Sequence, residues 1–163
     1  MIATRLAKLV MVASLAGFAF IVTFDNVTDY AANYAFVQHV LSMDTVFPDS
    51  PLMYRAITSP VVWQIAYDAI IAAEGVTCVL FAVGAFALAR ALCADAAVFD
   101  RAKRFAVVGT TLTFLIWFTG FMVVGGEWFA MWQSNVWNGQ QAAFRFYLTA
   151  LAVLLFVNQP EPG

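Results

Sequence analysis

Three ionisable side chains lie inside long apolar stretches of the sequence, where they could either carry out chemistry or hold helices together. Asp68 and Glu74 share one stretch, and Arg145 lies in another. An unpaired charge at the centre of a bilayer costs about 3 kcal/mol or more. We therefore expect these side chains to face a bundle interior, with Arg145 paired with Asp68 or Glu74. Tyr67 and Thr149 share helix faces with Glu74 and Arg145 and would complete the hydrogen bonds of this network.

Three interpretations of this intramembrane polar network stay open. It could be a static ion pair that fixes the register of two helices, or a polar contact to a partner subunit. It could also be a proton or ion path, or a site for a polar substrate. A proton relay usually contains several titratable groups, and Asp68 and Glu74 are the only two acids deep within the apolar stretches.

Other chemistry is poorly supported by the sequence. His39 is the only histidine, so one chain cannot provide bis-histidine haem ligation or a multi-histidine copper or iron site. Cys78 and Cys93 are too far apart in sequence to form a CxxC pair. No Gly-rich phosphate loop and no Ser-His-Asp pattern is present. We therefore expect a protein that is not an enzyme, with no catalytic residue, no metal site and no cofactor.

The elements that must position the network are four apolar stretches, near residues 6–24, 61–89, 105–126 and 141–157. Each is close to the ~20 residues that a helix needs to cross a bilayer. The chain is 63% hydrophobic and 11% charged, against about 25% charged in soluble domains. The sequence thus predicts an all-α fold, a four-helix transmembrane bundle that forms a single integral membrane domain over residues 1–163. The first stretch lacks an A-x-A-like cleavage site, which favours an uncleaved anchor over a signal peptide.

The distribution of basic residues predicts the orientation of the bundle. Six of the eight Lys and Arg residues lie at the start of the first stretch or between the second and third. By the positive-inside rule, both termini are expected in the cytoplasm. The segments 25–60 and 127–140 then lie on the opposite face. The short C-terminal tail is expected to be merely polar. A net charge of −2 without a basic stripe argues against a nucleic-acid partner.

The first exterior segment, 25–60, has the pattern of one or two short helices in a long periplasmic loop. Tyr30, Tyr34, Val37 and Leu41 recur at helical spacing, which predicts an amphipathic helix over residues 29–43. This helix would lie on the membrane or cap the bundle. Two Ser-Pro pairs, at residues 50–51 and 59–60, are typical of helix starts, and the second is expected to begin the second span.

The second exterior segment, 127–140, is rich in tryptophan. Trp128 and Trp132 are four residues apart, which predicts that they lie along one helix face. The segment could anchor the protein at the lipid headgroups and turn the chain. Alternatively it could form an exterior recognition surface. The residues of this candidate surface are Glu127, Trp128, Trp132, Trp137 and Asn138.

Small residues predict where helices approach closely. Ala13 and Gly17 have small-xxx-small spacing in the first stretch, and Gly109 and Thr113 have it in the third. In lipid, such pairs allow backbones to come into contact.

Several strings of the sequence resemble a bacterial family of predicted small integral membrane proteins of unknown function (domain of unknown function 2165). They are Asp25-Asn26, FVQHVLSMDT at 36–45, GEWFAMWQS at 126–134 and WNGQ at 137–140. The resemblance implies four spans and a location in the bacterial inner (plasma) membrane. It implies no catalytic residues, and it draws attention to the exterior face.

The sequence leaves three hypotheses of function. The first is a non-catalytic accessory or scaffold subunit of a larger membrane complex, associated with other integral membrane subunits or as a homo-oligomer. The second is an oligomeric transporter or channel component for small solutes or ions that uses Asp68, Glu74 and Arg145. The third is a lipid- or quinone-binding membrane protein. In each case the lipid bilayer is the chain's first partner.

Overall fold

The computed structural model describes residues 2–161, which form helices joined by short loops. The elements run in the order α1 (Ile2–Thr28), α2 (Tyr30–Ser42), η1 (Met53–Arg55), α3 (Pro60–Ala91), α4 (Ala96–Ala102), α5 (Arg104–Phe114), η2 (Leu115–Trp128), η3 (Met131–Gln133) and α6 (Gln140–Val157). Within this range no strand occurs. Four helical stretches are long and apolar enough to cross a membrane: Ile2–Thr28, Pro60–Ala91, Ala96–Trp128 and Gln140–Val157. The predicted all-α, four-helix transmembrane class is confirmed.

The third of these stretches is built from α4, α5 and η2 in sequence. Its last part, η2, is a π-helix over Leu115–Trp128. It ends with a bond from the Phe129 N–H to the Val124 carbonyl, at 3.0 Å. π-Helical turns are rare and occur often at functional sites. Here the wide helix carries Trp117 and Phe121, which line a cavity between the helices.

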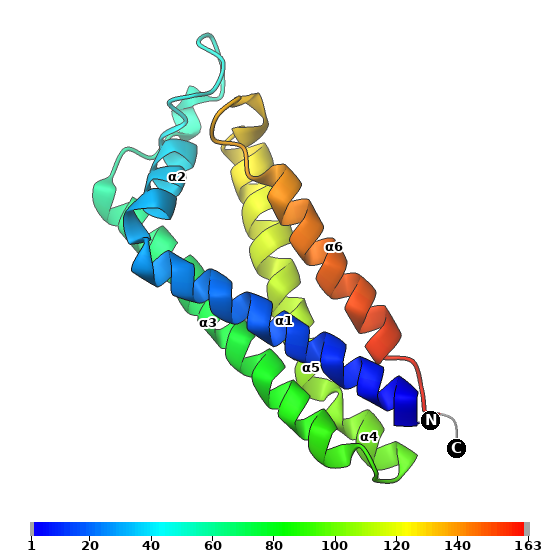
Figure 1. Ribbon diagram of the computed structural model, residues 1–163. Coiled ribbons are helices and arrows are strands. Elements are labelled where there is room, and N and C mark those ends of the chain that lie inside the picture. Colours follow the sequence, from blue (N-terminus) through cyan, green and yellow to red (C-terminus); the bar gives the residue numbers. More distant parts are fainter. Residues whose placement is uncertain (1, 162–163) are drawn as a thin grey trace.

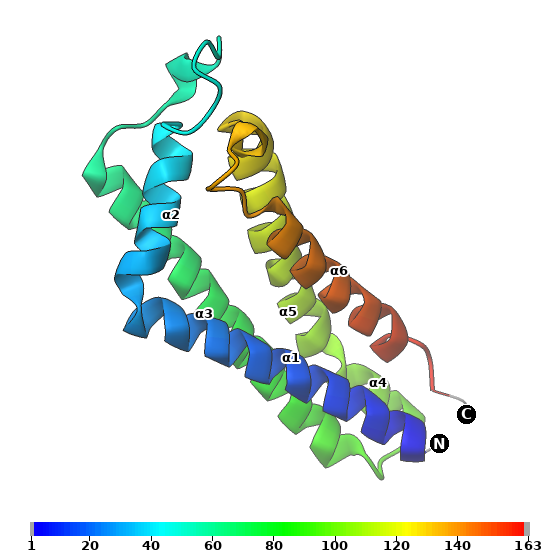
Figure 2. The same cartoon turned by 45° about the horizontal axis from the view of Figure 1, so that its top comes forward.

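The helices alternate in direction along the chain, so that both termini lie at one end of the bundle together with α4 (Figure 1). α1 packs along α3, and α6 packs along α5 and η2. Both views show these two pairs close together near the termini and spread apart toward the end that carries α2 (Figures 1 and 2).

The apolar core has two separate parts. At the terminal end, a cluster around Val12, Phe81, Leu88 and Phe99 joins all four spans. At the opposite end, Met43, Met131 and their neighbours form a second cluster between the two exterior segments. The space between the two clusters contains the cavities of the molecule.

Helices approach closely at one glycine that was expected, Gly109, and at one that was not, Gly84. A Cβ atom at Gly84 of α3 would lie 3.2 Å from the backbone nitrogen of Ala106 in α5. At Gly109, a Cβ would meet the ring of Phe81 at 3.0 Å. Gly17, by contrast, has nothing within 4 Å, so the expected contact at Ala13 and Gly17 is wrong. That face of α1 is exposed on the outside of the bundle.

The first exterior segment folds onto the open end of the bundle. α2 occupies most of the expected range 29–43, and it stops where Met43 takes a left-handed conformation with φ 55°. The chain then returns, and the Ile57 N–H donates to the Leu41 carbonyl at 2.8 Å. Ser59 and Pro60 begin α3 as expected. Residues 50–51 begin only a turn that leads into η1.

We expect Gly84→Leu to destabilise the bundle, because the added side chain meets the backbone of α5 rather than a side chain that can move. Overpacking of this kind costs about 1–3 kcal/mol. Thermal unfolding in detergent should show a lower midpoint for Gly84→Leu. Gly17→Leu is the matched control. Its thermal midpoint should equal that of the wild type, because its new side chain enters open space. Equal midpoints for Gly84→Leu and Gly17→Leu would contradict the packing at Gly84.

Candidate functional site

A buried network of neutral amides, a phenol and one carboxyl group lies where the helix pairs begin to spread. Asn26 of α1 donates from Nδ2 to Oε2 of Glu74 at 2.7 Å. Asn33 of α2 donates to Oδ1 of Asn26, also at 2.7 Å. The hydroxyl of Tyr67 on α3 lies 3.2 Å from both the backbone oxygen and Oδ1 of Asn26. Asn26 therefore links α1, α2 and α3 around the carboxyl group of Glu74.

This network forms one end of a cavity of about 320 Å³, which we call the polar cavity. Asp25 and Ile70 also line it, and α6 contributes Ala142 and Phe146. Its walls are largely aromatic: Phe36, Trp117, Phe121 and Phe146. The polar cavity thus combines a small polar end with broad apolar walls and lies between the two helix pairs.

A second cavity of about 310 Å³, the apolar cavity, lies next to the first and shares Phe36, Val37, Ile70 and Phe121 with it. Its other lining residues are apolar. A smaller space of about 30 Å³ continues from Glu74 toward Thr77 and Thr113. Glu74 therefore stands between a wide space and a narrow one.

Glu74 and Tyr67 are the two predicted network residues that the structure brings together, through Asn26. Asp68 lies on the exposed side of α3 and accepts a hydrogen bond from the Tyr30 hydroxyl at 2.7 Å. This hydrogen bond, with partial burial and the charge of Asp68, raises the pKa of Tyr30 to about 12. Asp68 thus ties α2 to α3 and does not contribute to the polar cavity.

The predicted ion pair between Arg145 and an acid is wrong. Arg145 is exposed on α6, and its guanidinium bonds to no side chain within residues 2–161. The buried face of α6 runs through Ala143 and Ala150. A residue two positions from Ala143 on a helix of 3.6 residues per turn points to the opposite side. Thr149 is also exposed, and its hydroxyl only donates to the Arg145 carbonyl, at 2.7 Å.

The tryptophans of the second exterior segment each contact the first exterior segment. Trp128 lies under the guanidinium of Arg55, at 4.6 Å from the ring centroid. The ring of Trp132 meets that of Phe47 at 5.8 Å, and Trp137 stacks on His39 at 4.5 Å.

The expected common helix face for Trp128 and Trp132 is wrong. The helix ends between them, and Ala130 turns the chain with φ 51°. Glu127 and Asn138 are exposed, and Asn138 accepts the Gln140 N–H at 3.1 Å, at the start of α6. Whether this surface recognises a partner remains a prediction.

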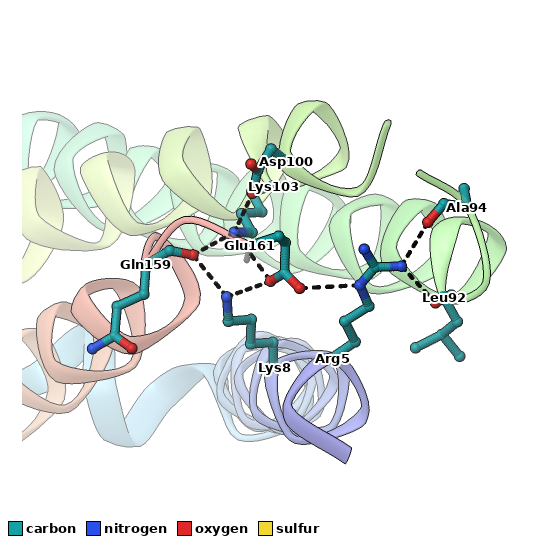
Figure 3. Close-up of polar contacts among 8 residues, drawn as sticks. All are labelled: Arg5, Lys8, Leu92, Ala94, Asp100, Lys103, Gln159 and Glu161. Atoms are coloured by element: carbon teal, nitrogen blue, oxygen red, sulfur yellow. Dashed lines mark hydrogen bonds and ion pairs between the residues drawn. The ribbon is translucent and has the colours of Figure 1, made fainter. Parts of the chain in front are cut away.

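An ion cluster at the opposite end of the bundle was not anticipated from the sequence. The carboxylate of Glu161 lies 3.0 Å from Nε of Arg5, 2.6 Å from Nζ of Lys8 and 3.5 Å from Nζ of Lys103 (Figure 3). Lys103 also pairs with Asp100. The Arg5, Lys8, Lys103 and Glu161 side chains are almost fully buried. The expected merely polar tail is therefore wrong, because its one acid closes a basic cluster.

Backbone carbonyl groups complete the cluster. Arg5 donates to the carbonyls of Leu92 and Ala94 in the loop after α3, at 2.9 and 2.6 Å. Lys8 and Lys103 both donate to the Gln159 carbonyl, at 2.8 and 2.7 Å. Burial alone would raise the pKa of Glu161, but the hydrogen bonds from Lys8 and Arg5 and the nearby positive charges lower it to about 2.

Part of this cluster has a sequence signal. Arg5 and Lys8 are three residues apart and so lie on one face of a helix. The acid they meet is 153 residues from Lys8 along the chain, and no local pattern indicates that pairing. Asn26 was missed for a different reason, since the first span was expected to end at residue 24 and α1 continues to Thr28.

An up-and-down bundle of four apolar helices with a buried ion cluster at one end defines a polytopic integral membrane protein. The chain belongs to the family described as predicted small integral membrane protein (DUF2165), whose model matches residues 4–160. No curated protein and no solved structure matches the chain significantly.

We expect Glu161→Gln to lower the thermal midpoint at neutral pH, because three buried cations then lose their shared carboxylate. Removing one partner of a buried ion pair costs about 2 kcal/mol or more. Asp95→Asn is the control, since Asp95 is exposed at the same end and its side chain caps no helix. Unchanged stability of Glu161→Gln in detergent would contradict this role.

The stability that Glu161 provides should also depend on pH in the acid range. Its pKa is lowered from an ordinary 4.5 to about 2 in the folded chain. The contribution is therefore fully present above about pH 4.5 and is lost as the pH falls toward 2. Midpoints measured between pH 2 and 6 should fall more steeply for the wild type than for Glu161→Gln. Parallel pH profiles of the wild type and Glu161→Gln would contradict the pairing of Glu161 with the three cations.

Proposed function

We propose that the protein binds a small amphipathic molecule from the bilayer in the polar cavity. The observation that carries this proposal is the combination of a buried hydrogen-bonding end, Asn26, Tyr67 and Glu74, with aromatic walls in one space of about 320 Å³. Small-molecule sites typically have about 300–1,000 Å³, apolar linings and a few polar groups that fix orientation. The polar cavity has each of these features.

The adjoining apolar cavity supports the same proposal. It shares one wall with the polar cavity, and residues such as Val40, Ala69 and Val124 make up the rest of its lining. A molecule with its polar group at Glu74 could extend its hydrocarbon part along Phe36 and Phe121 into this space. Because the cavities lie between the spreading helix pairs, the ligand would enter sideways from lipid rather than from water.

The other two hypotheses from the sequence are alternatives that one purification separates. The transporter hypothesis requires Asp68, Glu74 and Arg145 around one space, and only Glu74 lines the polar cavity. The accessory-subunit hypothesis requires a second membrane protein. Purification in mild detergent, with identification of all bound components, separates these hypotheses. A stoichiometric partner subunit is expected if the protein is an accessory subunit. A bound amphipathic molecule is expected if the polar cavity is a binding site.

We further propose that the protein spans a bacterial inner membrane with both termini in the cytoplasm. The ion cluster with Arg5, Lys8 and Lys103 lies at the same end as Arg101 and Arg104, near both termini (Figure 1). An excess of Lys and Arg near span ends is typical of the cytoplasmic face. The exterior segments with the tryptophans would then face the periplasm.

Cysteine labelling tests this orientation. Cys93 is exposed in the loop after α3, and Tyr54 is 75% exposed at the other end. A membrane-impermeant maleimide should leave Cys93 unlabelled in intact spheroplasts and label it after lysis. Tyr54→Cys in a Cys93→Ser background should be labelled in intact spheroplasts. Labelling of Cys93 before lysis would invert the proposed orientation.

Filling the polar cavity tests the binding function. Ala142 lines it, so Ala142→Trp should occupy the space that a ligand needs. Mass spectrometry of the wild type purified in mild detergent should detect an amphipathic molecule at near one per chain, and Ala142→Trp should lose it. The control is Ala152→Trp, since Ala152 is exposed on the same helix and does not line the cavity. Equal retention by Ala142→Trp, or no bound molecule in the wild type, would overturn the proposal.

A further inference from the structure

Both charged residues that line the polar cavity are acids, Asp25 and Glu74. Glu74 is 3% exposed, and its hydrogen-bond partner is the neutral amide of Asn26. None of the Lys, Arg or His side chains in the part of the chain that the structure describes pairs with it. Glu161, the other buried acid, is surrounded by three cations. Glu74 is thus a buried carboxyl group without a counterion.

The aromatic rings of the cavity provide a second, independent observation. Trp117 lies 4.7 Å from Phe121 and 4.7 Å from Phe146, measured between ring centroids. Aromatic faces carry partial negative charge and attract cations, most strongly in sites without water. Elsewhere in the protein arginines lie over rings, as Arg55 does over Trp128 and Arg5 over Phe99. Across residues 2–161, the cation–ring contacts involve none of the rings that line the polar cavity.

From these observations we infer that the polar cavity takes a lipophilic organic cation, whose positive centre lies beside Glu74 and whose apolar groups lie against Trp117, Phe121 and Phe146. This inference rests on the proposed function and specifies its ligand class. The ionised form of a carboxyl group is costly in a membrane, and a bound cation would stabilise that form at Glu74. Asp25, which is exposed at the cavity, carries a negative charge that also attracts a cation. An anionic lipid head would meet two acids and no basic residue.

The test compares two probes of nearly the same shape and opposite charge, tetraphenylphosphonium and tetraphenylborate. Binding of each labelled probe is measured by equilibrium dialysis against the full chain in nanodiscs of zwitterionic lipid, with empty nanodiscs subtracted. We expect saturable binding of the phosphonium and none of the borate. Glu74→Gln should weaken phosphonium binding by about tenfold or more, which corresponds to about 1.4 kcal/mol.

Two further variants separate charge in the cavity from general effects. Asp68→Asn removes an acid of the same helix that lies outside the cavity, and it should leave phosphonium binding unchanged. Trp117→Leu removes one aromatic wall and should also weaken phosphonium binding. This variant keeps the inference testable if Glu74→Gln does not fold. Size-exclusion chromatography establishes that each variant is folded before dialysis.

The outcomes distinguish the two proposals. Equal saturable binding of both probes, or phosphonium binding that survives both Glu74→Gln and Trp117→Leu, overturns the inference of a cationic ligand. If the phosphonium does not bind, but a neutral amphipathic molecule co-purifies and is lost in Ala142→Trp, the proposed function stands and the cationic preference is wrong. If neither probe binds and nothing co-purifies, both proposals are wrong.

Discussion

The arrangement of this bundle depends on one ion cluster at the terminal end, in which three cations surround one carboxylate. Arg5 and Lys8 come from α1, Lys103 from the junction of α4 and α5, and Glu161 from the tail that follows α6. Buried at the edge of a membrane, none of these charges is stable without the others. Their pairing draws the first span, the third span and the tail together. The guanidinium of Arg5 also lies 4.7 Å above the ring of Phe99, which connects the ions to the apolar core beneath them.

Toward the opposite end no buried ion cluster joins the helix pairs in the part of the chain that the structure describes, and the consequence for packing is different. Asn26, Asn33 and Tyr67 join α1, α2 and α3 through hydrogen bonds, but none of these bonds reaches α6. The pair of α6 with η2 therefore meets α2 and α3 mainly through aromatic side chains, such as the stacked rings of Phe36 and Phe121. These two rings line both cavities, which lie on either side of them.

The sequence was sufficient for features set by local pattern. Hydropathy predicts the four-helix transmembrane class, and the spacing of Tyr30, Tyr34 and Val37 predicts α2. The pairing of distant charges could not be predicted in this way. Arg145 and Glu74 both lie in spans, yet the helix rotation that turns Arg145 outward depends on how Ala143 and Ala150 pack. Glu161 meets Lys8 only because α6 ends beside the start of α1 and the tail continues there, and no periodicity encodes this meeting.

The same chain thus treats its two buried acids in opposite ways, and position explains why. Glu161 lies where the long stems of an arginine and a lysine of α1 and of a lysine at the start of α5 can reach it while their backbones stay near the membrane surface. Glu74 lies in the middle of a 32-residue helix, about 20 Å of helical rise from its start at Pro60. A permanent cation at that depth would itself need burial, at a cost that one carboxylate does not offset. A diffusible cation with apolar substituents avoids that cost, since its own hydrocarbon supplies the apolar surface and it can leave the site again. The separation of the two acids therefore lets one end of the bundle be fixed by internal ions, while the carboxyl group of Glu74 lines the polar cavity without an internal cation among residues 2–161.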